Sequence, residues 1–135
     1  QTTIAVVPCE LSKRIFNASR LVRFEGYRLL RCIGEGVSND VWSVRGYGSV
    51  AALKILKPSR LSYAGEVANR SKPALADHLA RECLKGQILH AHRPDLFVSC
   101  YKHGTKRVAS HMLPYTIHQL AVGISLKQWS TQERH

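Results

Sequence analysis

The sequence predicts an α+β fold with five strands and one main helix. Short runs in which apolar and polar residues alternate, separated by glycine, predict strands. One longer run, over residues 73–91, instead carries apolar residues at four-residue spacing, which is typical of a helix with one buried face. At 135 residues the chain can bury one modest core, so its size indicates a single domain.

The first part of the chain supplies an extension and three strands. Residues 1–26 mix apolar and basic side chains without a strong period, although 9–21 fits a short helix that packs on the domain. The strands are expected at 27–33, 41–45 and 50–56, and glycines open the turn between the first two. Residues 1–26 are therefore set apart as an N-terminal extension.

The second part supplies the helix and a last hairpin. Within the helix expected at 73–91, Gly86 is unfavourable and costs roughly 1 kcal/mol relative to alanine. Beyond the helix, alternating runs at 97–103 and 107–113 flank a glycine-bearing triplet at 104–106. This arrangement predicts two strands joined by a turn at that triplet.

A glycine-bearing loop stands between the first two strands, in the run IGEGVSNDVW at 33–42. Glycine at 34 and 36 would let backbone N–H groups approach an anion, because no Cβ stands in the way. Lys54, on the third strand, would add a point charge. The pattern predicts a phosphate-covering loop with its lysine. The alternative is a glycine-bearing hairpin that binds no ligand.

These landmarks give the chain a resemblance to a known family. Residues 27 to about 129 resemble the N-terminal lobe of the eukaryotic-type protein kinases, with Val41 closing the pattern G-x-G-x-x-G-x-V and Lys54 two strands after the first. Asn39 stands where the family has its third glycine, and asparagine tolerates a positive φ. Residues 88–98 resemble the passage from the family's helix C through a His-Pro turn into its strand 4.

The resemblance implies a fold and a set of roles. The fold is a five-stranded antiparallel sheet with helix C, and the ligand is ATP. Lys54 would contact the α- and β-phosphates, and Glu82, in the middle of the helix, would orient Lys54; Glu66 is expected in a loop and solvated. A hinge at 112–115 would meet adenine. The residues expected to bind the nucleotide with Lys54 are Ile33, Gly34, Glu35, Gly36, Asn39, Val41, Ala52, Met112, Leu113 and Tyr115.

The resemblance stops before the second lobe of a kinase. The sequence holds neither an Asp-Phe-Gly motif nor a His-Arg-Asp loop with its later asparagine, and the similar run at 92–96 is expected to be a turn around Asp95. Residues 27–122 are therefore expected to be the lobe, and 123–135 the start of the segment from hinge to helix D. We expect a truncated, inactive fragment with no metal ligands of its own, in which Mg²⁺ would bind only with the missing lobe.

The parent enzyme expected from this resemblance is a kinase that phosphorylates protein serine or threonine, with tyrosine as a second option. A pseudokinase-like module that only binds proteins is the main alternative. The net charge of +11 adds a rival, a basic nucleic-acid-binding domain. That rival is disfavoured, because the 20 basic residues are scattered and none of the familiar nucleic-acid motifs occurs.

Location is inferred from the cysteines and from hydropathy. The four cysteines, at 9, 32, 83 and 100, show no C-x-x-C spacing and are expected to be free, as small apolar residues in a reducing cytosol. No apolar run approaches a membrane span, so no membrane partner is expected. We therefore expect a cytoplasmic protein, with secretion into a host as an effector left open.

Overall fold

The computed structural model describes residues 8–57 and 66–120, with side chains in the long helix described from residue 76. Within those ranges the chain forms two helices and six strands. In chain order these are α1 Glu10–Ala18, β1 Arg23–Phe24, β2 Tyr27–Glu35, β3 Asn39–Gly46, β4 Ser49–Leu56, α3 Glu66–His92, β5 Cys100–Val108 and β6 His111–Gln119. No described helix is long and apolar enough to cross a membrane.

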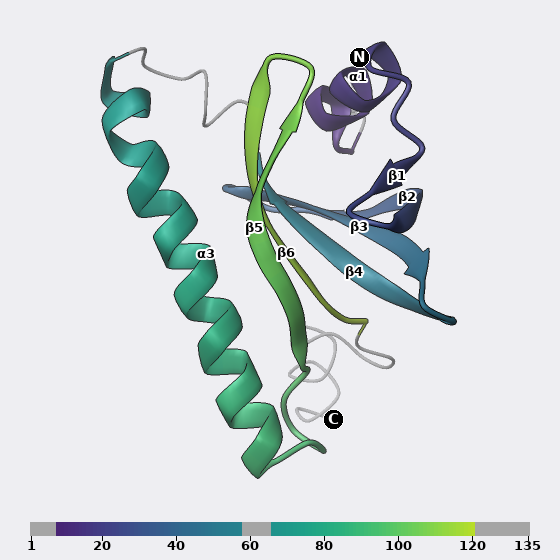
Figure 1. Ribbon diagram of the computed structural model, residues 1–135, viewed down its shortest axis with the longest axis vertical. Coiled ribbons are helices and arrows are strands. Elements are labelled where there is room, and N and C mark those ends of the chain that lie inside the picture. Colours follow the sequence, from purple (N-terminus) through teal and green to yellow (C-terminus); the bar gives the residue numbers. More distant parts are fainter. Residues whose placement is uncertain (1–7, 58–65, 121–135) are drawn as a thin grey trace, which may run out of the picture.

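The strands form one curled antiparallel sheet in the order β1-β2-β3-β4-β6-β5 (Figure 1). The expected α+β class is confirmed, but the expected count of five strands is wrong. The additional strand is β1, which contributes only two residues and pairs with the start of β2. Two residues are too few to show an alternating pattern, so sequence periodicity could not detect this strand.

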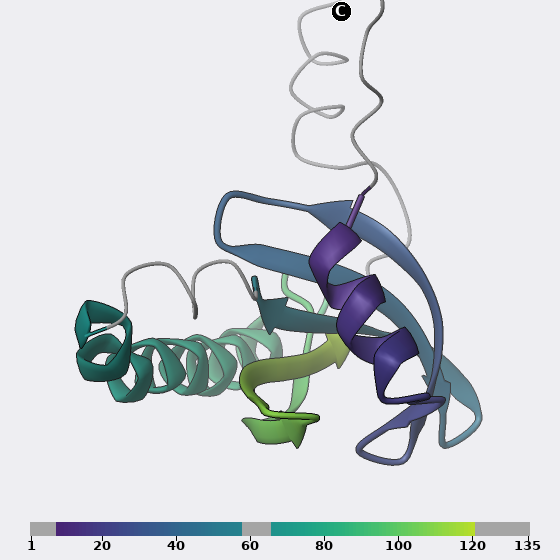
Figure 2. The same cartoon turned by 90° about the horizontal axis from the view of Figure 1, so that it is seen from above.

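The two helices cover opposite faces of the sheet (Figure 2). Paired residues on neighbouring strands point to the same face, so the row Trp42, Leu53, Ile117 faces α1 and the row Val41, Lys54, Thr116 faces α3. The main core lies on the α1 side, with Leu56 joining it from the Lys54 face. Its buried members are Cys9, Phe16, Phe24, Tyr27, Trp42, Val44, Ala51, Leu53, Ile55, Leu56, Val108, Leu113, Tyr115 and Ile117.

Helix α1 is part of this core, as expected for a short helix within residues 9–21. The Phe16 ring packs edge-on against the rings of Trp42 and Phe24, with centroids 5.1 and 6.3 Å away. The buried Ser12 hydroxyl accepts a hydrogen bond of 3.1 Å from Trp42 Nε1, which satisfies the indole donor inside the core. The N-terminal segment therefore completes the domain.

The last hairpin turns five residues later than the sequence predicts. Gly104 lies inside β5, and the chain reverses at Ala109 and Ser110, where Ala109 has a φ of 55°. A Cβ at Gly104 would stand 3.1 Å from the Tyr115 hydroxyl oxygen, so this glycine gives room to a ring in the core. The glycine therefore signals a close approach of side chain to backbone, and its interpretation as a turn was wrong.

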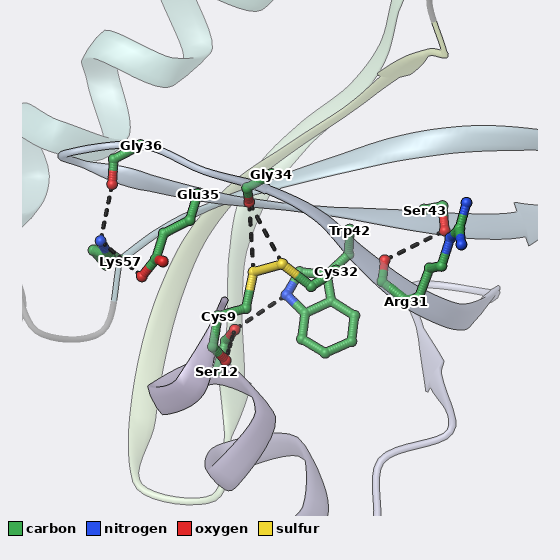
Figure 3. Close-up of a disulfide and its surroundings, with 10 residues drawn as sticks. All are labelled: Cys9, Ser12, Arg31, Cys32, Gly34, Glu35, Gly36, Trp42, Ser43 and Lys57. Carbon is green, nitrogen blue, oxygen red and sulfur yellow. Dashed lines mark hydrogen bonds and ion pairs between the residues drawn. A yellow bond between two sulfur atoms is a disulfide. The ribbon is translucent and has the colours of Figure 1, made fainter. Parts of the chain in front are cut away.

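The four cysteines form two disulfides, Cys9–Cys32 and Cys83–Cys100. The expectation of free cysteines is therefore wrong. The first bond joins the start of α1 to β2 (Figure 3), and the second joins α3 to the first residue of β5. The partners are 23 and 17 residues apart, and the folded chain brings them together, so no local spacing motif marks either pair.

Candidate functional site

The candidate site is centred on an ion pair between the sheet and the long helix. Lys54 Nζ, from the middle of β4, lies 3.5 Å from Glu82 Oε2 on α3. The two side chains are 30% and 45% exposed, so water screens the pair and its net contribution to stability is small. What matters is its position, because the pair joins two elements whose residues are 28 apart in sequence.

Glu82 is shared with a second basic group that the sequence analysis missed. His78 Nε2 lies 3.0 Å from Glu82 Oε1, so the two carboxylate oxygens face two different partners. His78 precedes Glu82 by four residues, which places both side chains on the same face of a helix. This spacing was a signal that could have identified the contact from sequence.

The first loop glycine, Gly34, lies on the same side of the sheet as Lys54. Gly34, Val41 and Lys54 pair in register across β2, β3 and β4, so the missing side chain at Gly34 leaves that row open toward α3. Neither loop glycine has a positive φ, and Asn39 is a strand residue, so the expected need for a left-handed backbone is not met. Space, and not backbone conformation, is what Gly34 provides in this structure.

Lys57 fixes the tip of the loop (Figure 3). Its Nζ lies 2.9 Å from Glu35 Oε1 and donates a 2.9 Å hydrogen bond to the carbonyl oxygen of Gly36. Its backbone N–H donates to the carbonyl oxygen of Ser38 at 2.7 Å. Within the loop, the Gly36 N–H donates to the carbonyl oxygen of Asn39 at 2.8 Å. Glu35 and Gly36 are therefore engaged within the protein.

The Cys9–Cys32 disulfide lies under the same loop (Figure 3). Its two sulfurs lie 3.4 and 3.6 Å from the carbonyl oxygen of Gly34. A disulfide sulfur carries no hydrogen, so these are packing contacts and not hydrogen bonds. The strand that leads into the loop is thus linked covalently to α1.

Two cavities flank the ion pair. The first, of about 370 Å³, lies between the loop and α3 and is lined by Ser38, Asn39, Leu56, His78, Leu79 and Glu82. The second, of about 230 Å³, lies between α3 and the sheet and is lined by Lys54, Glu82, Cys83, Gly86, Val98, Cys100, Thr116 and His118. Glu82 borders both, so the carboxylate stands between the loop side and the sheet side of the helix.

His118 is a further polar group in the smaller cavity. Burial lowers the pKa of its imidazole, while a hydrogen bond with the Gln119 backbone raises it and the positive charge of Lys54 lowers it again. Because the net shift is downward, His118 is neutral at pH 7. The cavity therefore offers the Lys54–Glu82 ion pair together with neutral polar groups, including the buried Thr116 hydroxyl.

The structure separates the expected hinge residues from Lys54. Met112, Leu113 and Tyr115 lie in the first half of β6, within a continuous strand. Leu113 and Tyr115 are buried on the α1 face, in the core, which is the face opposite Lys54, and Met112 is 38% exposed. The error follows from the turn assigned to 104–106, because the later turn moves the end of the last strand to Gln119.

Other expected contact residues do share the Lys54 side. Ala52 is buried two residues before Lys54 and pairs with His118. Ile33 lines a third cavity, of about 410 Å³, and Leu120, which the sequence analysis missed, lines it too. The remaining lining residues are Arg28, Leu29, Leu30, Arg31, Ser43 and Val50.

The remaining expectations concern residues near the helix end and at the C-terminus. Asp95 lies in a turn and forms a 2.9 Å ion pair with Arg93, as expected for a residue outside any catalytic loop. Glu66, expected in a loop, is instead the first residue of α3. The segment 123–135, expected to begin helix D, lies outside the described residues. Among the described residues, no group of three His, Cys, Asp or Glu side chains is arranged to hold a metal ion.

Comparison with known proteins adds no relative. No protein-family model matches the chain, and a search of curated proteins finds no match either.

Proposed function

We propose that this chain is the ATP-binding lobe of a protein kinase. The observation that carries the proposal is the Lys54–Glu82 pair, 3.5 Å apart, between β4, the second strand after the glycine loop, and α3, the helix on that face of the sheet. In kinases the corresponding lysine and glutamate must both be in place for the lysine to hold the nucleotide phosphates.

The surroundings of the pair suit a polyphosphate. Gly34 leaves room beside Lys54, and the 370 Å³ cavity lies beneath the loop tip, next to Glu82. The phosphates would lie where this cavity meets the 230 Å³ cavity, which Lys54 lines, and would contact the Lys54 ammonium, a compact charge that suits phosphate oxygens. Glu82 would keep the lysine side chain extended across the row of Gly34 and Val41.

The position proposed for adenine differs from the one expected from sequence. We place the base against the 410 Å³ cavity, where Ile33 and Leu120 supply apolar contact, with Ala52 on the same face as Lys54. Leu113 and Tyr115 are removed from the adenine site because they are buried on the other face of the sheet. Met112 is removed because it lies near the start of β6 and not in a hinge after that strand.

Binding and transfer are separable in this proposal. The residues that would orient a substrate hydroxyl and hold Mg²⁺ in a kinase have no counterpart motif in the sequence. We therefore assign nucleotide binding to this chain, and transfer to protein serine or threonine to a parent kinase that supplies the second lobe. A pseudokinase-like binding module remains the second candidate, since Asn39 departs from the glycine pattern.

The disulfides bear on location. Bonds such as Cys9–Cys32 and Cys83–Cys100 persist in oxidising compartments and are rare in the cytosol. They favour a protein that folds in an oxidising compartment over the cytoplasmic location that free cysteines had suggested. We therefore prefer a secreted location to a cytoplasmic one.

The test is nucleotide binding by matched lysine variants of the whole chain. Lys54→Met should weaken ATP binding by about tenfold or more, which corresponds to about 1.4 kcal/mol. Lys106→Met is the control, because Lys106 is 26% exposed and also ion-paired, at 3.1 Å to Glu25, but lies on β5 with its side chain over the Phe24 ring in the α1-side core. An unchanged affinity in Lys54→Met, or equal losses in both variants, would exclude Lys54 as a phosphate ligand.

A further inference from the structure

We propose that the Cys83–Cys100 disulfide is a redox-sensitive clamp that positions Glu82 against Lys54, so that ATP binds tightly only to the oxidised chain. The inference rests on the proposed function for its ligand. The structural part of the inference does not depend on that function: a bond that a reductant can open holds the helix against the sheet.

The position of the bond is what makes it a clamp. Cys83 directly follows Glu82 on α3, and its partner Cys100 begins β5, the edge strand beside β6. Glu82 is therefore one residue from a covalent link to the sheet that carries Lys54. A rotation or shift of α3 that moved Glu82 away would have to move Cys83, and the bond prevents that.

Helix α3 lies against β5 and β6, but few of its side chains are buried there in the range 76–92. Of the α3 side chains described from residue 76 on, Leu79 and Cys83 are buried, while Leu84 and Ile88 are 51% and 61% exposed. Gln87 Nε2 donates a 2.8 Å hydrogen bond to the carbonyl oxygen of Cys100, the same residue that forms the disulfide. Within residues 76–92, the covalent bond of α3 to the sheet and the Gln87 hydrogen bond therefore both end on Cys100.

The ion pair itself cannot hold the helix in place. Lys54 and Glu82 are both partly exposed, and such pairs contribute little because water screens them and their side chains lose freedom. His78 also competes for the Glu82 carboxylate at 3.0 Å. If the helix were released, Glu82 could follow His78 away from Lys54. The disulfide therefore keeps the Glu82 carboxylate within reach of Lys54.

A small dithiol supplies the chemistry that opens the clamp. One thiolate of the dithiol attacks a sulfur of the Cys83–Cys100 bond, which breaks the bond and forms a mixed disulfide. The second thiolate of the dithiol then displaces the protein sulfur, so the dithiol becomes a cyclic disulfide. The two electrons and two protons it loses leave Cys83 and Cys100 as thiols. Both cysteines line the 230 Å³ cavity, which gives a reductant a route to them.

The first experiment measures the ATP dissociation constant of the whole chain before and after dithiothreitol treatment. For the wild type, reduction should raise the constant by about tenfold or more. Cys83→Ser/Cys100→Ser should bind weakly in both conditions, whereas Cys9→Ser/Cys32→Ser should keep the response to reductant. An unchanged constant in wild-type protein whose Cys83 and Cys100 thiols have become alkylatable would overturn the proposal.

An epistasis test separates positioning from a general structural effect. In Glu82→Gln, reduction should cause no further loss of ATP affinity, because the clamp acts through that carboxylate. If reduction weakens ATP binding as much in Glu82→Gln as in the wild type, the bond does not act through Glu82 and the positioning role is rejected.

Hydrogen exchange tests the clamp without nucleotide. On reduction, amide protection in residues 76–92 of α3 should fall by about tenfold or more, while β3 and β4 keep theirs. If neither the oxidised nor the reduced protein binds ATP, the proposed function is wrong. The hydrogen-exchange result still shows whether the disulfide holds α3 against the sheet. Unchanged protection in α3, or equal loss in helix and sheet, would show that no local clamp exists. The measurement uses wild-type protein, so it does not depend on the folding of any cysteine variant.

Discussion

Gly46 and Gly86 differ in how much space surrounds the position of a Cβ atom, and the sequence does not reveal this difference. At Gly46 an added Cβ would stand 2.7 Å from Cδ2 of the Tyr27 ring, a distance that carbon atoms do not tolerate. At Gly86, in α3, the nearest atoms would be the Val98 carbonyl oxygen at 3.8 Å and Cys100 Cβ at 3.9 Å, which is ordinary contact. Of these two positions, only residue 46 lacks the space for a side chain.

We predict opposite signs for the two alanine variants. Gly46→Ala should lower the free energy of unfolding by about 1–3 kcal/mol, because Tyr27 must move within a packed core. Gly86→Ala should raise it by up to about 1 kcal/mol, because alanine is the better helix former and finds no clash. Urea unfolding of both variants gives the answer. A stabilised Gly46→Ala would mean that the Tyr27 ring has room to move.

Asp40 is a buried carboxyl on the α1 face, 1% exposed, and its Oδ1 has no hydrogen-bond partner among the described residues. Burial raises the pKa of this carboxyl above its ordinary value of 3.8; Ser12 lowers it, the charge of Glu35 raises it and Lys57 lowers it. A raised pKa means that the folded state binds its proton more tightly than the unfolded state. Stability from this group is therefore present below pH 3.8 and is lost as the pH rises through the folded pKa.

Asp40→Asn should therefore stabilise the protein at pH 7, by about 1 kcal/mol, because it removes a buried charge. The gain should shrink as the pH falls toward 3.8. The measurement is urea unfolding across this pH range with the disulfides intact. A gain that is the same at all pH values would show that Asp40 does not titrate with folding.

Glu25 provides a control of opposite sign for that series. Hydrogen bonds from Lys102 and Lys106 lower the pKa of its carboxyl below 4.5. Its stabilising contribution is therefore present above pH 4.5 and is lost as the pH falls through the folded pKa. Glu25→Gln should destabilise the protein at pH 7 and match the wild type in strong acid.

At the scale of elements, the segment before the first long strand proves to be integral. Helix α1 supplies Phe16 to an aromatic cluster with Phe24 and Trp42, and the Cys9–Cys32 bond ties its start to β2. The expectation of a short helix on the domain was correct. Its burial, however, depends on rings from β1 and β3 that no local pattern in 1–26 reveals.

We predict that α1 contributes strongly to stability. Phe16→Ala should cost about 3–5 kcal/mol, because it removes a buried ring and leaves a cavity. Leu11→Ala, in the same helix but 40% exposed, should cost less than about 0.5 kcal/mol. Denaturant midpoints of the two variants decide this. Equal, small losses would mean that α1 is only loosely docked.

At the scale of the whole molecule, the net charge of +11 is the property that composition predicts best. Most of the acidic residues that the structure describes form ion pairs with basic residues. Glu25, Glu35 and Glu82 each contact a lysine of the sheet or its edge. The excess positive charge is thus spread over the surface, which favours weak attraction for any polyanion.

We predict that nucleic acid binds this chain only through that diffuse charge. The affinity for a short DNA duplex should fall steeply between low and physiological salt, and Lys54→Met and Lys106→Met should each reduce it slightly and equally. ATP binding should distinguish the two variants. Tight duplex binding at physiological salt, without any ATP binding, would favour the nucleic-acid function.

The sequence by itself determined the α+β class, three strands around a glycine loop, a long helix with Glu82 on it, and Lys54 on the second strand after the loop. These follow from local periodicity, which the backbone geometry of helices and strands imposes on neighbouring residues. Only the tertiary structure decided that Gly104 makes room for Tyr115, that Met112 to Tyr115 belong to a strand, and that the four cysteines pair. Each depends on contacts between residues distant in the chain, so no local pattern records it.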